Sequence, residues 1–374
     1  MEDLAVYIHW PYCERICPYC DFNVYRNRDV DADRWTSALI GTIAAWRQRT
    51  GPRRLASIYF GGGTPSLAPT ETIARVIDAC RTEWEPTEDV EITLEANPTD
   101  AERARFDAFR NAGVNRLSLG VQSFDDDALR LLGRNHGRIE ARNALDAALE
   151  AFEHVTFDLI YALPGQTSAD WRAALREALS IGAPHLSAYQ LTIEQGTAFQ
   201  KAVARGDWRP PDGDASADLF DITQDETARA GLVAYEVSNH AREGRQSRHN
   251  LAYWRGRDYL GVGPGAHGRL TENGARVATE TLRRPEVYLA ATEKDGLGLC
   301  VDEALSPEDA LAERVTMGLR TTEGVRLTSS DDQRLANRIA PLQGEGLLVR
   351  RDDALIATPT GRRVLNAVAA ALLA

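Results

Sequence analysis

The stretch that decides the fold is Tyr7-Ile-His-Trp-Pro-Tyr-Cys-Glu-Arg-Ile-Cys-Pro-Tyr-Cys20, in which an apolar run leads directly into three cysteines. Cys13, Cys17 and Cys20 have the spacing C-x3-C-x2-C. Three thiolates so close in sequence can hold one side of a metal centre, and a [4Fe-4S] cluster held in this way leaves one iron open to another ligand. A structural zinc site needs four ligands, and no fourth Cys or suitably spaced His follows. We therefore expect an iron–sulfur cluster, with a zinc site completed by a remote ligand as the alternative.

The first 200 residues alternate between short β-branched or aromatic runs and amphipathic stretches. We expect strands over residues 4–10, 55–60, 90–95, 116–121, 155–161 and 185–191. We expect helices between them, over residues 33–49, 70–84, 100–111, 139–152 and 168–181. This alternation predicts an α/β fold with a parallel sheet, here a partial (β/α)6 TIM-like barrel, and a flavodoxin-like or Rossmann sheet is the alternative. The barrel is favoured because an unusual motif follows each strand, where barrel enzymes carry their sites.

The remainder of the chain divides into two further regions. Residues 201–305 are expected to form an irregular α/β extension, with a helix over 215–231 and a glycine-rich stretch over 259–268. Residues 306–374 predict a winged-helix-like domain with helices over 307–319 and 331–342 and a hairpin over 347–358. Residues 331–363 hold six arginines and five acids, so no basic stripe is present for DNA. We expect this module to pack or to dock a protein partner.

The composition narrows the class of protein and its location. With 43% hydrophobic and 26% charged residues in 374, the chain is typical of globular proteins. Its net charge of -12 disfavours nucleic acid and anionic lipid as partners. It holds no transmembrane segment of about 20 apolar residues, and its first residues lack the pattern of a signal peptide, so we expect a cytoplasmic protein. The two remaining cysteines, Cys80 and Cys300, are interpreted as core residues.

The cysteine loop and the glycines of Gly61-Gly-Gly-Thr-Pro65 together resemble the radical S-adenosylmethionine (SAM) superfamily. The segments YIHWPYC, FGGGTPS, LEANP, GVQSF, LGRNH and DLIYALPGQT, in this order, are similar to its oxygen-independent coproporphyrinogen III oxidase-like group. The resemblance implies a [4Fe-4S] cluster on the three cysteines and SAM bound to its open iron. It also implies a set of SAM-binding positions, namely Tyr7, Gly62, Gly63, Thr64, Glu95, Gln122, Arg134 and Asp158.

Two departures from the coproporphyrinogen dehydrogenases of this group point to its haem chaperone branch. Those enzymes carry one more cysteine two positions after the triad, where this chain has Phe22, and a longer arm before the triad. The chaperone branch has an H-N-x-x-Y-W motif, which is similar to His249, Asn250, Tyr253 and Trp254 here. An imidazole can ligate iron and the two aromatic rings can pack on a porphyrin. From the residues alone, a hydrogen-bonded histidine beside core aromatics is the alternative.

The resemblance as a whole implies a haem chaperone that carries a [4Fe-4S] cluster, SAM and haem. Its implied partners are acceptor haem proteins, respiratory ones among them, and a ferritin-type donor, and we expect a monomer or weak homodimer. The alternative is a radical SAM enzyme that decarboxylates coproporphyrinogen or opens the haem ring, and no catalytic residue is assigned. Three other histidines are not expected to be ligands: His9 in the first strand near the cluster, His136 beside Arg134, and His267 at the barrel mouth.

Overall fold

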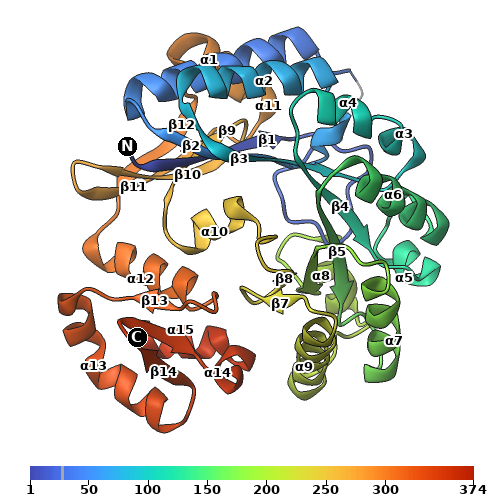
Figure 1. Cartoon of the computed structure of the whole chain (residues 1–374), viewed down its shortest axis with the longest axis vertical. Coiled ribbons are helices and arrows are strands. Elements are labelled where there is room, and N and C mark those ends of the chain that lie inside the picture. Colours follow the sequence, from blue (N-terminus) through green and yellow to red (C-terminus); the bar gives the residue numbers. More distant parts are fainter. Residues whose placement is uncertain (27–28) are drawn as a thin grey trace.

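One curved sheet of twelve strands dominates the computed structural model, which describes residues 1–26 and 29–374 (Figure 1). Its central strands run parallel and in chain order, each paired with the next: β1 (Asp3–Trp10), β2 (Arg54–Gly62), β3 (Glu85–Ala96), β4 (Arg116–Gln122), β5 (His154–Tyr161) and β6 (His185–Gln190). A doubly wound sheet reverses its strand order at a switch point. The sequential order seen here excludes the Rossmann alternative and confirms the partial (β/α)6 barrel.

Helices cover the convex face of this sheet (Figure 1). They follow the strands along the chain as α1 (Ala32–Thr50), α2 (Thr70–Glu83), α3 (Asp100–Arg103), α4 (Phe106–Asn111), α5 (Asp126–Leu131), α6 (Arg138–Ala151) and α7 (Ser168–Leu179), with a short 3-10 turn, η1 (Pro65–Leu67), after β2. In α2 the buried residues Ile73, Val76, Ile77 and Cys80 recur at three- and four-residue spacing, as an amphipathic helix requires. The main core therefore lies between these helices and the sheet.

The concave face of the barrel is polar, and β3 shows how the sequence produces both faces. Side chains of successive strand residues point to opposite faces. Ile92 and Leu94 belong to the apolar core beneath the helices, whereas Thr93 and Glu95 line a cavity on the other side. Polar side chains from several strands are thus collected inside the barrel.

Residues 201–305 widen the same sheet at both edges, which differs from the expected irregular extension. After α8 (Ala198–Arg205) and α9 (Gly213–Arg229), two short strands join the edge at β6, and four strands reach the edge at β1. The elements of this region are β7 (Val233–Ala234), β8 (Asn239–Ala241), α10 (Arg248–Trp254), β9 (Asp258–Val262), β10 (His267–Glu272), β11 (Ala275–Thr281), α11 (Pro285–Asp295) and β12 (Leu299–Ala304). Glycines interrupt the apolar runs and hide these strands in the sequence. At Gly263, with a φ of +101°, a Cβ atom would lie 2.3 Å from the carbonyl oxygen of His9.

The last region forms a separate unit with its own apolar core, which includes Leu311, Val315, Leu335 and Leu355. The expected helices and hairpin are present, and the hairpin turns at Asp352, whose φ is +53°. The elements are α12 (Pro307–Gly318), β13 (Val325–Arg326), α13 (Ser329–Gly344), β14 (Leu348–Arg351), β15 (Ala354–Ala357), α14 (Pro359–Arg363) and α15 (Leu365–Leu373), with the strands in the order β13-β15-β14. This order of elements fits a winged helix.

The two cysteines outside the triad differ in burial. Cys80 is fully buried in α2, as expected. Cys300 is exposed on β12, and the expectation of a core thiol is wrong there. This strand lies at the edge of the sheet, and most of its residues are exposed. Among the described residues, no helix is both long and apolar enough to cross a membrane.

Candidate functional site

The loop that carries the three cysteines is tied back to the barrel by its own backbone. The amide of Cys13 donates to the carbonyl of Tyr25 at 3.0 Å, and the amide of Tyr25 donates to the carbonyl of Pro11 at 2.7 Å. Within the loop, the amide of Cys20 donates to the carbonyl of Cys17 at 3.1 Å. All three thiols are free. The loop therefore holds three sulfur ligands in one compact turn directly after β1.

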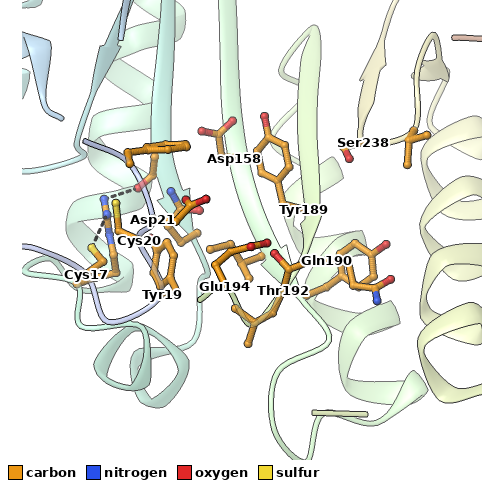
Figure 2. Close-up of a pocket in the computed structure, with 18 of the residues that line it drawn as sticks. Cys17, Tyr19, Cys20, Asp21, Asp158, Tyr189, Gln190, Thr192, Glu194 and Ser238 are labelled. Carbon is orange, nitrogen blue, oxygen red and sulfur yellow. Dashed lines mark hydrogen bonds between the residues drawn. The ribbon is translucent and has the colours of Figure 1, made fainter. Parts of the chain in front are cut away.

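The three cysteines line one cavity of about 990 Å³ at the carboxyl ends of the parallel strands. Figure 2 shows Cys17 and Cys20 on one side of this cavity, Asp158 and Tyr189 in the middle and Ser238 on the other side. Seven of the eight positions that the resemblance assigns to SAM also line it: Gly62, Gly63, Thr64, Glu95, Gln122, Arg134 and Asp158. The cavity therefore brings the expected cluster ligands and SAM positions together.

Tyr7 is the exception among the eight positions. Its side chain lies inside the barrel, where its hydroxyl is 3.1 Å from Nδ1 of His9. Nε2 of His9 lies 2.9 Å from the carbonyl oxygen of Asn23, beyond the cysteine loop. Burial lowers the pKa of His9 to about 4. A neutral His9 thus accepts a hydrogen bond from the hydroxyl of Tyr7 and donates one to the carbonyl of Asn23, which anchors the far side of the cysteine loop.

The thiols suit a cluster held by thiolates. Burial raises the pKa of Cys13, and it raises the pKa of Cys20 to about 11, so these thiols need a metal or a cation to stabilise their charged forms. A cation is present beside the third thiol, because Nη1 of Arg134 lies 3.4 Å from Sγ of Cys17. Within residues 1–26 and 29–374, no three His, Cys, Asp or Glu side chains gather closely enough for a single metal ion.

Two glycines at the end of β2 allow this strand to pass against the cysteine loop. Gly62 has a φ of +103°, and a Cβ atom there would lie 2.5 Å from the ring of His9. At Gly63 a Cβ atom would lie 2.7 Å from the carbonyl oxygen of Tyr12. A side chain at Gly62 would collide with the ring of His9 on β1, and one at Gly63 would push the start of the cysteine loop away from the strand. The two glycines therefore allow the cysteine loop to pack closely on the barrel rim. They also leave room for a ligand in the cavity that they line.

Two half-buried carboxyl groups face the cavity from β3 and β5. Burial raises the pKa of Glu95 to about 7, although the hydroxyl of Tyr59 donates to it at 2.7 Å. Burial, and next the charge of Glu95, raise the pKa of Asp158 to about 7. A cationic ligand would stabilise the charged forms of both groups. SAM carries a sulfonium and an ammonium group, so the pair fits it.

Arg134 is held in place by acceptors from two strands. It donates to the carbonyl of Gly120 at 2.8 Å and to the side-chain oxygen of Asn97. Asn97 in turn donates to the hydroxyl of Thr64 at 3.2 Å and lines the same cavity. Sequence reasoning assigned no role to Asn97, although it lies in the LEANP motif that carried the resemblance. The neighbouring Gln122 has a left-handed φ of +67°, which turns the chain at the end of β4.

Comparison with known proteins gives the same family. Residues 7–178 match the model of the Radical SAM superfamily, and residues 305–364 match the HemN C-terminal domain. The chain is 34% identical to the Heme chaperone HemW of Bacillus subtilis, with 99% of each chain covered. It is 39% identical to the mitochondrial Radical S-adenosyl methionine domain-containing protein 1 of Bos taurus, over 99% of this chain and 87% of the relative.

The chain belongs to the HemW family of radical SAM proteins. A solved structure of Escherichia coli coproporphyrinogen III oxidase (HemN), described as a radical SAM enzyme, shares the fold. The match has a TM-score of 0.82 at 24% identity and covers 99% of this chain and 90% of that one. The similarity to this enzyme extends through the C-terminal domain.

The H-N-x-x-Y-W motif of this HemW family member lies in the floor of the barrel, and none of its four residues lines the 990 Å³ cavity. His249 is 2% exposed, stacks on the ring of Tyr59 at 4.8 Å, and has its pKa lowered to about 3 by burial. Asn250 lines a separate inner cavity of about 40 Å³, shared with Glu95 and Asp158. Tyr253 packs against His249, with ring centroids 5.0 Å apart.

The helix that carries this motif is fixed to the floor by Glu91 of β3. This carboxylate accepts from the backbone amides of Arg248 and His249 at 3.1 and 3.0 Å and from the hydroxyl of Ser247 at 3.2 Å. A carboxylate at the amino end of a helix is favourable for the helix dipole. In this arrangement the motif closes the end of the barrel opposite to the cysteines.

The other histidines lie apart from the expected cluster ligands. His136 is buried, with Nε2 3.1 Å from the carbonyl oxygen of Val121, and burial lowers its pKa to about 4. The side chain of His267 is 53% exposed and is not among the residues that line the large cavity. Neither contributes to the candidate site.

Proposed function

We propose that this chain is a haem chaperone that binds haem and transfers it to acceptor proteins in the cytoplasm, with a [4Fe-4S] cluster on Cys13, Cys17 and Cys20 and SAM beside it. One observation supports this most directly. A single large cavity joins the three thiols, the carboxyl pair of Glu95 and Asp158, and a more distant wall that continues to the C-terminal domain. This cavity has room for a second, larger ligand beyond the SAM positions. The name carried by bacterial relatives supports haem as that ligand.

Different residues of the cavity would hold the cluster and SAM. A bound cluster would supply an open iron for SAM and one-electron chemistry. Arg134 places a positive charge beside the sulfur of Cys17 and is itself oriented by Asn97 and Gly120. Glu95 and Asp158 become charged when a cation enters, and they line the same cavity as the cysteine loop. The cluster and SAM are then structural or regulatory parts of the chaperone.

The motif residues His249, Asn250, Tyr253 and Trp254 remain the predicted haem contacts. Their support is the resemblance to the chaperone branch. Direct iron ligation by His249 requires α10 to leave the barrel floor, because this imidazole is buried beneath the strands. Respiratory acceptors and a ferritin-type donor are part of the proposal as partners.

The test is a haem titration of anaerobically reconstituted protein, followed by transfer to an apo haem protein. We expect a saturable Soret change and then loss of haem to the acceptor. Steady conversion of coproporphyrinogen III or of haem, with matching consumption of SAM, would instead identify an enzyme. The exposed Phe22 at the cavity, in place of the further cysteine of the dehydrogenases, supports the chaperone over this alternative. Absence of any saturable Soret change would contradict the proposal.

A further inference from the structure

The end of the large cavity away from the cysteines is built by two distant parts of the chain. Val237 and Ser238 come from the turn before β8, and Arg320 and Arg362 come from the C-terminal domain. In Figure 2, Ser238 lies across the cavity from Cys17 and Cys20, beyond Asp158 and Tyr189. The C-terminal domain thus contributes three arginines, Arg320, Arg362 and Arg363, to a cavity that otherwise belongs to the barrel.

Arg320 is fixed on two sides. Its Nη2 atom lies 3.6 Å from Oε2 of Glu236, and its guanidinium lies over the ring of Trp254 at 4.7 Å from the centroid. Glu236 is fully buried, and its other oxygen already accepts from the amide of Ser238 at 2.7 Å and from Asn239 at 2.6 Å. The Nε atom of Arg320 is buried and, among the described residues, has no hydrogen-bond partner. Arg320 is therefore held in one orientation and still has a free hydrogen-bond donor.

Arg362 is less well satisfied than Arg320. Its Nη2 atom is buried and meets no acceptor in the part of the chain that the structure describes. Burial lowers the pKa of Arg362, and the nearby charge of Arg320 adds to this effect. The adjacent Arg363 differs, because it forms an ion pair with Asp221. Glu236 forms its ion pair with Arg320 and acts on Arg362 only as a nearby charge, and no ion pair of Arg362 is found within residues 1–26 and 29–374.

An uncompensated, partly buried guanidinium is costly unless a ligand supplies the matching anion. The guanidinium group pairs with carboxylates through parallel hydrogen bonds. Apolar residues also line the cavity, among them Ile160, Leu191 and Phe220. The cavity therefore offers acids for a cation, apolar residues along its walls, and arginines for an anion at the end away from the cysteines.

We infer that Arg320 and Arg362 form a carboxylate-binding subsite that receives the propionate groups of a tetrapyrrole lying in this cavity. The inference rests on the proposed function, because a tetrapyrrole combines a broad apolar body with carboxylates on one edge. In this arrangement Trp254 contributes to haem binding without touching haem, because its ring positions Arg320. It also gives the C-terminal domain a role in ligand binding.

The experiment compares haem with haem dimethyl ester, in which the carboxylates are neutral, by anaerobic Soret titration of the reconstituted full chain. We expect wild type to bind haem at least about tenfold more tightly than the ester, because a desolvated charged hydrogen bond is worth about that much. Arg362→Gln should remove this preference, because it lowers the affinity for haem and leaves the affinity for the ester unchanged. Arg362→Lys should keep part of the preference. Arg334→Gln is the matched control, because Arg334 pairs with Glu308 on the surface of the same domain.

The outcomes separate this inference from the proposed function. Equal affinity of wild type for haem and its ester would overturn the subsite and leave the chaperone in place. Absence of saturable binding of either ligand would overturn both. Should Arg362→Gln fail to fold, as judged by its thermal transition against that of Arg334→Gln, the wild-type comparison and the Arg362→Lys variant still decide the question.

Discussion

Nδ1 of His249 and Oγ of Ser57 lie 2.9 Å apart inside the barrel, where the hydrogen bond joins α10 to β2. The other ring nitrogen of His249 is buried and has no hydrogen-bond partner among the described residues. The imidazole is held between the rings of Tyr59 and Tyr253. The histidine of the expected haem motif is thus part of the packing that closes the barrel floor.

We predict that His249→Ala lowers the free energy of unfolding by about 2 kcal/mol, because it removes a packed ring and leaves the hydroxyl of Ser57 without its partner. Chemical denaturation at neutral pH measures this change. Ser57→Ala is the matched variant, with a smaller expected loss of about 1 kcal/mol. A haem-loaded His249→Ala protein of unchanged stability but shifted Soret band would instead make His249 an iron ligand.

Much of the candidate site could be predicted from the sequence, because the carboxyl ends of parallel strands meet at one rim of a barrel. In the sequence, each predicted strand leads into an unusual motif, and this pattern predicts that Gly62, Glu95, Gln122 and Asp158 lie at that rim. The structure brings these four residues to one cavity. Tyr7 could not be placed in this way. It lies in the middle of β1, where the face that a residue occupies depends on the register of the strand.

Other features depend on contacts between distant segments and left no local pattern. Arg320 and Arg362 reach the cavity only because the C-terminal domain packs against the barrel. The burial of His249 depends on Glu91, which lies 158 residues earlier and fixes the start of α10. Strands β9 to β12 are short, and glycines interrupt β9 and β10, so their sequence indicates an irregular extension. They belong to the sheet because β9 pairs with β1, a strand that lies far away in the sequence.

The cysteine loop gives a direct test of the cluster. We predict that Cys17→Ala abolishes the broad visible absorbance of the anaerobically reconstituted protein, because three thiolates are needed to hold the cluster. Cys300→Ser should leave both the absorbance and the iron content unchanged, since this thiol is exposed on an edge strand far along the chain. Equal iron and sulfide contents in wild type and Cys17→Ala would contradict the assignment, and zinc in place of iron would favour the alternative metal.

Gly62, at the end of β2, allows a test of the close packing at the barrel rim. We predict that Gly62→Ala lowers the free energy of unfolding by about 2 kcal/mol or more, because its Cβ atom would lie 2.5 Å from the ring of His9 and its φ is +103°. Gly41→Ala is the matched control, because Gly41 lies within α1 with no atom near its added Cβ. The free energy of unfolding of this control should rise by about 0.5–1 kcal/mol. Thermal and chemical unfolding of the two variants measure the difference, and equal effects would contradict the packing argument.

The carboxyl groups facing the cavity make the stability of the ligand-free protein depend on pH. The pKa of Glu95 rises from an ordinary value of 4.5 to about 7 on folding, so the native state binds more protons than the unfolded state between these values. Stability from this group therefore falls as pH rises from about 4.5 to 7. We predict that Glu95→Gln is more stable than wild type by about 2 kcal/mol at pH 8 and gains little at pH 4.5. Unfolding curves at the two pH values measure this, and an equal gain at both would contradict it.

The same acids should make SAM binding depend on pH in the opposite sense. A cationic ligand gains from charged carboxylates, and Glu95 and Asp158 are charged only above their pKa values of about 7. We predict that the affinity of the reconstituted protein for SAM rises severalfold between pH 6 and pH 8, and that the rise is smaller in Glu95→Gln. Equilibrium dialysis with labelled SAM measures both curves. Glu140→Gln, at the start of α6 and away from the cavity, should follow wild type. A flat profile in wild type would mean that other residues balance the charge of SAM, and the assignment of the carboxyl pair to this ligand would be wrong.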